Sequence, residues 1–482
     1  MNQETTTALK SNFINHLRNI KAPFLNLQKK ISSSPYSYLA YCFFIPVIVM
    51  YLIYLAREIH PFGDGSVLVL DLNGQYVYFF EALREAILGD GSLLYSFSRA
   101  LGGEFVGIYA YYLASPLSYL VALFPQDRML EALLTIILLK TGLCGLTFGF
   151  YLHKNSKHPN KLAVIAFSLM YAMSAFAVVH QNNVMWTDAL IWLPLLVYGL
   201  EQLIKRRKYK LYVISLAMIL MSNYYIGYMV CIFTVAYFFY YSFAHRAEET
   251  NLTGEKAHLL MAFVRFGIFS LVAAAIAGFI LCGAYYSLTF GKDTFSNPSW
   301  AFESNFEILD FLTKFLPGSY DTVRPEGLPF VYCGLLVLLL VPVYFLAKKI
   351  PSREKVASVL LIAFFALSFI IKPIDLIWHG FSRPNWLNYR YSFMLCFFLI
   401  VMAYRAFTNL RTTSRKPMIA IGAIIGLGVI VLQEFAPIIK EDLNEYIDVH
   451  DFQTVWLTIG CLIVYTIIVC LMPRVKNKEL VS

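Results

Sequence analysis

The chain has 482 residues, of which 59% are hydrophobic and only 14% are charged, and its mean hydropathy is +0.61. Soluble proteins carry roughly 25% charged residues, so this composition excludes a soluble globular fold, and the continuous apolar runs exclude the alternating pattern of a β-barrel. The net charge of +9 arises largely in short loops between apolar runs, a pattern that orients membrane spans and argues against nucleic acid as a partner.

A basic, polar stretch opens the chain, and apolar runs alternating with loops follow it. We expect residues 1–37 to form a cytoplasmic N-terminal segment and Tyr38–Ala56 to be a retained first span, because a cleavable signal peptide has a much shorter basic region. A long polar stretch, 57–128, comes next and is the predicted first outer loop. Later runs approach the ~20 apolar residues that cross a bilayer. They lie at Met129–Leu152, Leu162–His180, Asp188–Ile204, Leu211–Phe243, Met261–Leu288, Pro329–Ala347, Val356–Ile371, Tyr391–Ala406, Pro417–Glu434 and Thr454–Leu471.

Two segments are ambiguous, and the distribution of Lys and Arg decides how they are interpreted. Phe105–Phe124 is apolar enough to span but holds Pro116 between two serines, whereas Leu211–Phe243 is too long for one upright helix. If the first segment stays at the outer surface or dips into it, and the second folds into two spans at Ser222–Tyr225, the strongly cationic loops all face inward.

The resulting prediction is an all-α polytopic membrane protein of about twelve spans, with both termini in the cytoplasm. The multi-span domain covers 38–472, further outer loops lie at 289–328 and 372–390, and 473–482 forms a cytoplasmic tail. Nearly every unusual polar motif then falls on the outer side.

The first outer loop contains Asp71 and Gln75, just beyond the first span. A carboxylate at the interface can act as a general base toward an acceptor hydroxyl. The alternative is a helix cap or a solvated loop acid, and residue type alone favours that alternative.

Asn182 and Asp188 lie at the predicted outer mouth of a span. Asp188 suits the N-cap of the helix that continues to Ile204, a role that commonly contributes about 1 kcal/mol, and it also suits a contact to a substrate hydroxyl. Asn223 and Tyr224 lie at the predicted break in the long run, where they either line a wet cavity or belong to an interfacial tyrosine cluster.

The segment from Ile377 to Phe393 is the densest polar and aromatic cluster, and it contains His379, Arg383, Asn385 and Arg390. Outward-facing arginines suit a phosphate group, which a guanidinium binds bidentately. Snorkelling arginines beside belt aromatics are the alternative. The chain has neither a Walker A motif nor an HExxH motif, which argues against chemistry driven by a cytosolic nucleotide. We therefore expect a preactivated substrate or a gradient to supply the energy for the protein's activity.

Several of these motifs, taken together, resemble the YfhO family of bacterial membrane proteins. They are DLNGQYVYFFEAL, SFSRALGGEFVGIYAYYLASPLSYL, NNVMWTDALIWLPL, SNYYIGYM and HGFSRPNWLNYRYSF, in order from Asp71 to Phe393. The family is similar to membrane-embedded glycosyltransferases of the GT-C fold, which implies a GT-C-like bundle. Its members are often longer, so the resemblance also implies a short or truncated member.

The resemblance implies transfer of a sugar from an undecaprenyl-phosphate-linked donor to a surface polymer such as teichoic acid, on the outer face of the cell membrane. Asp71 would be the catalytic carboxylate, Arg383 and Arg390 would hold the lipid phosphate, and Asn182 and Asp188 would contact sugar or acceptor. A divalent metal between Asp71 and Asp188 is compatible with the sequence, although no spacing demands one. A sugar-lipid synthase and a flippase would be upstream partners.

The competing class is a multi-span transporter or lipid-linked sugar flippase, which the predicted broken span would suit.

Overall fold

A computed structural model describes residues 34–97, 99, 101–245, 255–290, 298–319, 322–435 and 452–471. Among the described residues, the regular elements are helices apart from one antiparallel pair of short strands, β1 (Tyr95–Ser96) and β2 (Gly103–Glu104), and turns and irregular segments connect them. The predicted all-α polytopic architecture is therefore confirmed. Residues 1–33 of the predicted N-terminal segment and the predicted tail 473–482 lie outside the described residues.

Within the described residues, seven helices are long and apolar enough to cross a membrane. They are α2 (Leu39–Ala56), α5 (Met129–Asn155), α8 (Thr187–Arg206), α10 (Tyr224–Ala244), α11 (Glu255–Ile276), α18 (Arg415–Phe435) and α19 (Phe452–Leu471). The remaining predicted spans contain shorter or differently composed helices, namely α6 (Lys161–Ala172), α7 (Ala175–Val179), α9 (Lys210–Ser222), α14 (Leu335–Leu346), α15 (Ser352–Ile370) and α17 (Ser392–Thr408). Helix α12 (Gly278–Thr289) follows α11 within one predicted span. Each predicted span thus holds a helix, while the number of spans stays a prediction.

The segment Phe105–Phe124 is bent rather than straight. Its first half comprises α4 (Val106–Ile108) and the π-helical turn η2 (Tyr109–Leu113), and its second half is the 3₁₀ helix η3 (Pro116–Leu123). The two halves meet at an angle of 98°, which fits a broken span or a re-entrant loop. The bend falls at Ser115, because the proline that follows disfavours helical backbone at the preceding residue.

The long run Leu211–Phe243 breaks at the predicted place. Asn223 is extended, with φ −160° and ψ 109°, between α9 and α10. Its side-chain oxygen accepts a hydrogen bond of 2.8 Å from the Ile226 N–H, which satisfies a free donor at the start of α10.

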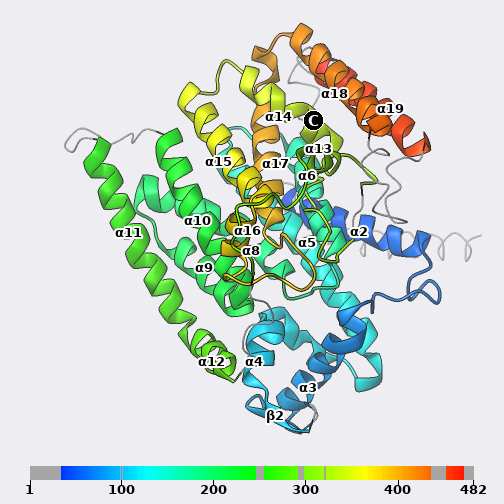
Figure 1. Ribbon diagram of the computed structural model, residues 1–482, viewed down its shortest axis with the longest axis vertical. Coiled ribbons are helices and arrows are strands. Elements are labelled where there is room, and N and C mark those ends of the chain that lie inside the picture. The colour runs from blue at the N-terminus through cyan, green and yellow to red at the C-terminus, as the bar shows by residue number, and fades with distance from the viewer. Residues whose placement is uncertain are drawn as a thin grey trace, which may run out of the picture.

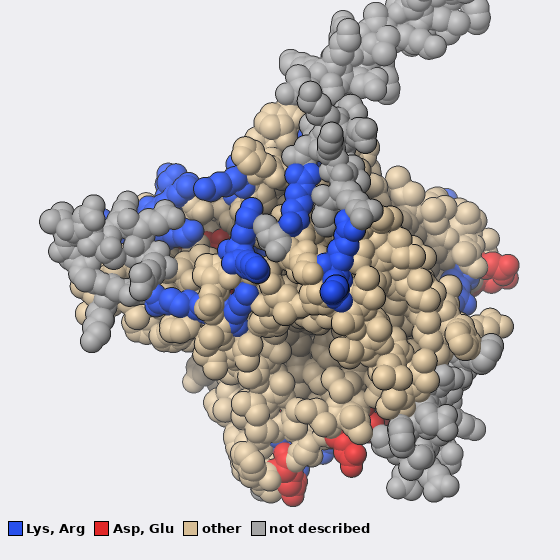
Figure 2. All heavy atoms as spheres, turned by 90° about the horizontal axis from the view of Figure 1, so that it is seen from above, with Lys and Arg blue, Asp and Glu red and all other residues tan. Residues whose placement is uncertain are grey.

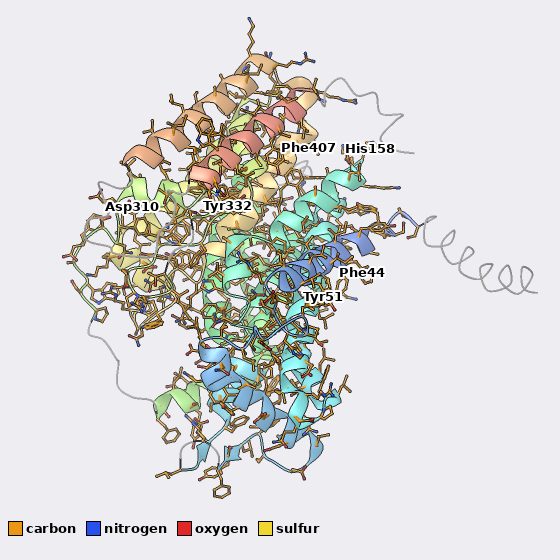
Figure 3. All side chains as sticks on the ribbon, turned by 90° about the vertical axis from the view of Figure 1, so that its right-hand side faces the viewer. Phe44, Tyr51, His158, Asp310, Tyr332 and Phe407 are labelled. Atoms are coloured by element: carbon orange, nitrogen blue, oxygen red, sulfur yellow. The ribbon has the colours of Figure 1, made fainter. Side chains whose placement is uncertain are left out.

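The centre of the bundle is formed by α5 and α8, and other helices surround them (Figure 1). Burial covers 72% of the apolar window of α8 and 67% of that of α5, but only 17% for α11 and 11% for α18. The peripheral helices therefore turn apolar side chains outward, as a lipid environment requires. Phe44 and Tyr51 on the outer side of α2 (Figure 3) show the same property, with 55% and 41% exposure.

The two ends of the bundle differ in composition. Helix α3 (Val77–Leu88), β2 and α4 lie at one end, and α14, α15 and α18 reach the other (Figure 1). Figure 2 looks onto this second end, where Lys and Arg side chains gather. His158, before α6, and Phe407, near the end of α17, also lie at this end (Figure 3).

A buried ion pair joins the two central helices. Lys140 on α5 donates from Nζ to Asp188 Oδ2 on α8 at 2.5 Å and to the Val184 carbonyl at 2.8 Å. The Ser115 hydroxyl donates to the other carboxylate oxygen at 2.7 Å. Both charged side chains are at most 2% exposed. The pair therefore fixes α5, α8 and the bend of the outer segment to one another.

Removing one partner of this pair should destabilise the protein strongly. We expect Lys140→Met to lower the free energy of unfolding by about 3–5 kcal/mol, because it leaves an unpaired buried carboxylate. Lys140→Met combined with Asp188→Leu should recover most of that loss. Unfolding by SDS in mixed micelles measures both variants. The exposed Lys157→Met should stay within about 0.5 kcal/mol of the wild type, and a Lys140→Met protein of equal stability would contradict the role of the pair.

Candidate functional site around Asp71 and Arg390

Hydrogen bonds link the three predicted outer loops to one another. Between the second and third loops, the Leu387 N–H donates to the Val323 carbonyl at 2.6 Å, and the Lys372 N–H donates to the Glu303 carbonyl at 3.1 Å. Arg390 donates to the Tyr111 hydroxyl in the first loop at 3.2 Å. The structure therefore brings together polar motifs that lie far apart in the sequence.

Asp71 lies at the start of a π-helical turn, η1 (Leu72–Tyr76), which continues into α3. The side chain is partly buried. Its Oδ1 accepts a hydrogen bond from Gln75 at 3.3 Å, and its Oδ2 accepts one from the Tyr76 hydroxyl at 3.3 Å. Single π-helical turns occur frequently at functional sites, and here the wider turn places Gln75 and Tyr76 beside the carboxylate. Gln75 thus lies where the sequence predicted it, next to Asp71.

Tyr76 connects Asp71 to the segment that precedes α8. Its hydroxyl also lies 3.3 Å from Asn183 Oδ1, and Asn183 donates to Asn182 Oδ1 at 3.4 Å. Burial raises the pKa of the Tyr76 phenol, and the nearby Tyr112 and Asp71 raise it further. The phenol therefore stays protonated and acts as a donor, although its single hydrogen serves only one of the two acceptors at a time.

A row of tyrosine rings leads from Tyr76 to Arg390. The ring centroids of Tyr76 and Tyr112 are 5.0 Å apart, and those of Tyr112 and Tyr111 are 4.6 Å apart. Tyr111 in turn contacts Tyr224, at 5.8 Å between centroids, and accepts the hydrogen bond from Arg390. A carboxylate and a guanidinium thus occupy opposite ends of one aromatic wall.

The Arg390 guanidinium is held in place from several sides. Nε donates to the Leu387 carbonyl at 2.9 Å and one terminal nitrogen donates to the Trp386 carbonyl at 3.0 Å. The group lies 4.9 Å from the centroid of the Trp186 ring and 5.2 Å from that of Tyr225. Arg390 is therefore a fixed cation, not a snorkelling side chain.

Behind Trp186 lie buried polar atoms whose hydrogen bonds are incomplete. Both ring nitrogens of His180 and the indole nitrogen of Trp186 make no hydrogen bond within the described part of the chain. The two rings are 5.3 Å apart between centroids. Buried polar groups normally have hydrogen-bond partners. Because the Arg390 guanidinium lies over the Trp186 ring, we include these atoms in the candidate site.

Asp188 has a different role from either one that the sequence suggested. It is not the N-cap, because it lies within the first turn of α8 and no side chain caps that helix. Its two oxygens are occupied by Lys140 and Ser115, and it is 1% exposed. Each carboxylate oxygen thus already accepts one hydrogen bond from within the protein, and among the described residues no three His, Cys, Asp or Glu side chains form a metal cluster.

Asn223 and His379 support the site and do not line it. Asn223 donates to the Tyr111 carbonyl at 2.7 Å in addition to capping α10, which uses both ends of its amide. His379 Nδ1 lies 3.0 Å from the Tyr225 hydroxyl, and its Nε2 lies 3.5 Å from Asp375 Oδ1. Both side chains are at least 98% buried, and His379 Nε2 makes no hydrogen bond within the described residues, so their predicted substrate contacts stay predictions.

Arg383 and Asn385 are exposed in the loop after α16 (Lys372–Trp378), and within the described residues neither forms a hydrogen bond or an ion pair. Of the two arginines predicted to bind phosphate, only Arg390 is held in the tyrosine wall. Conversely, the sequence analysis assigned no role to Tyr76, Tyr111 or Tyr112. The double tyrosine just before the Ser115–Pro116 bend was the available signal.

Comparison with known proteins supports the resemblance noted in the sequence. The family described as "Bacterial membrane protein YfhO" matches residues 42–482. The chain is 24% identical over 352 residues to "Uncharacterized protein YfhO" of Bacillus subtilis (strain 168). The alignment covers 70% of this chain and 37% of the relative, so the chain spans well under half of that protein. No solved structure matches the chain.

A matched pair of arginine variants tests this geometry independently of any activity. Arg390→Lys keeps the charge but loses two carbonyl contacts and much of the stacking on Trp186 and Tyr225, so we expect a loss of about 1–3 kcal/mol in stability. Arg383→Lys should change stability by less than about 0.5 kcal/mol. SDS unfolding in mixed micelles measures both, and equal effects of the two substitutions would contradict the assignment.

Proposed function

Because the chain belongs to the YfhO family of bacterial membrane proteins, we propose that it is a membrane glycosyltransferase of the cell membrane. It moves a sugar from an undecaprenyl-phosphate-linked donor to a hydroxyl of a surface polymer such as teichoic acid, at the outer face. The observation that carries the proposal is Asp71 at one end of a tyrosine wall and Arg390 at the other. In this arrangement both termini are cytoplasmic, and the cationic end of the bundle faces the cytoplasm.

The chemistry needs a base and a fixed positive charge on opposite sides of the anomeric carbon. The acceptor oxygen attacks that carbon while Asp71 takes the hydroxyl proton. The bond from the anomeric carbon to the phosphate oxygen breaks, and undecaprenyl phosphate leaves with the electron pair. Arg390 stabilises the negative charge that develops on the phosphate. A direct displacement of this kind inverts the anomeric configuration.

The other residues of the site have supporting roles in the proposal. Gln75 and Tyr76 orient the Asp71 carboxylate through its two oxygens. The rings of Tyr112 and Tyr224 offer apolar faces to the sugar, as aromatic side chains do in most ligand pockets. Asn182 lies at the Tyr76 end of the wall and would contact sugar or acceptor hydroxyls. A separate synthase must load the donor lipid, and a flippase must deliver it to the outer leaflet.

A lipid-linked sugar flippase is the second candidate, and the broken helix at Asn223 favours it because transporters use discontinuous helices at their substrate sites. Here, however, the Asn223 side chain is fully engaged in tying α10 to the first outer loop. Proteoliposomes containing a labelled undecaprenyl-phosphate sugar and an acceptor polymer separate the two. Label in the polymer supports transfer, whereas movement between leaflets without transfer supports the flippase.

Asp71→Asn should abolish most of the transfer. A positioned general base contributes about 10²–10⁴-fold to rate, so we expect a loss of that size in turnover with little change in folding. Asp64→Asn is the matched control, because Asp64 is an exposed acid of the same loop, and it should keep wild-type turnover. Transfer by Asp71→Asn at the wild-type rate would refute the catalytic role of Asp71.

A further inference from the structure

A buried glutamate lies where three helices meet. Glu201, near the end of α8, is only 4% exposed. Its Oε1 accepts hydrogen bonds from the Tyr151 hydroxyl of α5 at 3.0 Å and from the Tyr237 hydroxyl of α10 at 2.9 Å. Its Oε2 accepts one of 2.9 Å from the Asn155 side chain at the end of α5. The glycosyl-transfer proposal uses none of these residues.

The hydrogen-bond partners of this glutamate carry no charge. Within the described residues, no Lys, Arg or His nitrogen forms an ion pair with the Glu201 carboxylate. The guanidinium of Arg405, on α17, is paired with Glu354 of α15. Lys205, one turn farther along α8, is exposed, and its ammonium lies 5.7 Å from the centroid of the Tyr241 ring. An ionised Glu201 would therefore leave a negative charge inside the bundle without an adjacent cation.

The other two buried acids of the central helices avoid such a charge by pairing. Asp188 meets Lys140, and Glu354 meets Arg405. An ionised carboxylate that is buried without a cation is far more costly than the neutral acid, so an acid in that position binds a proton. Ionisable side chains within membrane spans also commonly mark proton sites. The same physical constraint that joins Lys140 to Asp188 thus favours a proton on Glu201.

The hydrogen bonds around Glu201 have room for that proton. The phenols of Tyr151 and Tyr237 are within hydrogen-bonding reach of each other as well as of Oε1. When Oε1 is protonated it donates to Tyr237, Tyr237 donates to Tyr151, and Tyr151 donates to Oε1, so each oxygen gives and accepts one hydrogen bond. Tyr240, a further phenol near Glu201, carries no charge at neutral pH. Asn155 is exposed, so the proton exchanges with solvent on that side.

We propose that Glu201 is a proton-binding site, occupied at neutral pH, at the junction of α5, α8 and α10. One proton from water adds to Oε1, and its release returns the carboxylate. The bound proton lets the three helices pack around the acid without a buried charge, whereas its release places a negative charge between them. The site does not depend on the glycosyl-transfer proposal, and a protein without transferase activity would carry it equally.

Infrared spectroscopy of the full chain, purified in dodecyl maltoside, tests the proposal at neutral pH. This detergent has no carbonyl group, and ordinary Asp and Glu side chains are ionised under these conditions. We expect the carbonyl stretching band of a protonated carboxyl group, shifted in deuterated water, and the loss of this band in Glu201→Gln. Glu307→Gln removes an exposed acid and should leave the band as in the wild type. Identical wild-type and Glu201→Gln spectra in this region would overturn the proposal.

Unfolding by SDS separates a neutral acid from an ionised one. Glutamine has the shape of the neutral acid, so Glu201→Gln should keep the wild-type midpoint, whereas Glu354→Gln leaves Arg405 unpaired and should lower it. Equal losses in the two variants would show that Glu201 is ionised. Lys205→Gln should leave the infrared band unchanged. A band that appears only in Lys205→Gln would mean that Lys205 holds an ionised Glu201, and the proposal would fail.

Discussion

The arrangement of this protein depends on burying one lysine and one aspartate inside an apolar bundle. Neither Lys140 nor Asp188 reaches solvent, and an isolated charge at that depth is far more costly than a pair. The two side chains must therefore meet, which fixes the rotation of α5 against α8. Because Ser115 donates to the same carboxylate, the bend at Ser115 is positioned by the same constraint.

The candidate site follows from this arrangement. The start of α8 carries Trp186, with Asn183 just before it, and the segment before the Ser115 bend carries Tyr111 and Tyr112. Anchoring both segments to one ion pair brings these side chains to the same place, where Tyr76 links them to Asp71. At the opposite end, Glu354 pairs with Arg405, and Lys and Arg side chains gather on the surface (Figure 2). The two ends of one bundle thereby acquire different chemistry, one with a partly exposed carboxylate and one with an excess of positive charge.

Local sequence patterns predicted where helices break better than they predicted which distant residues the polar side chains contact. The break at Asn223 followed from a run too long for one helix, and the bend at Ser115 followed from the proline beside it. Asp188 was misread because an acid ahead of an apolar run has the local signature of an N-cap, while its actual partner is 48 residues away on another helix. Asn223 and His379 lie near the site and contact the scaffold there, while their predicted substrate contacts stay predictions.

By itself, the sequence determined the membrane environment, the helical class, the family and the main helix breaks, because hydropathy and proline act through neighbouring residues. Only the tertiary structure decided which polar groups are occupied. It engaged Asp188 with Lys140, fixed Arg390 among Trp186 and Tyr225, and left Arg383 exposed. The physical reason is that a buried charge or amide must find a partner, and that partner is set by how distant helices pack.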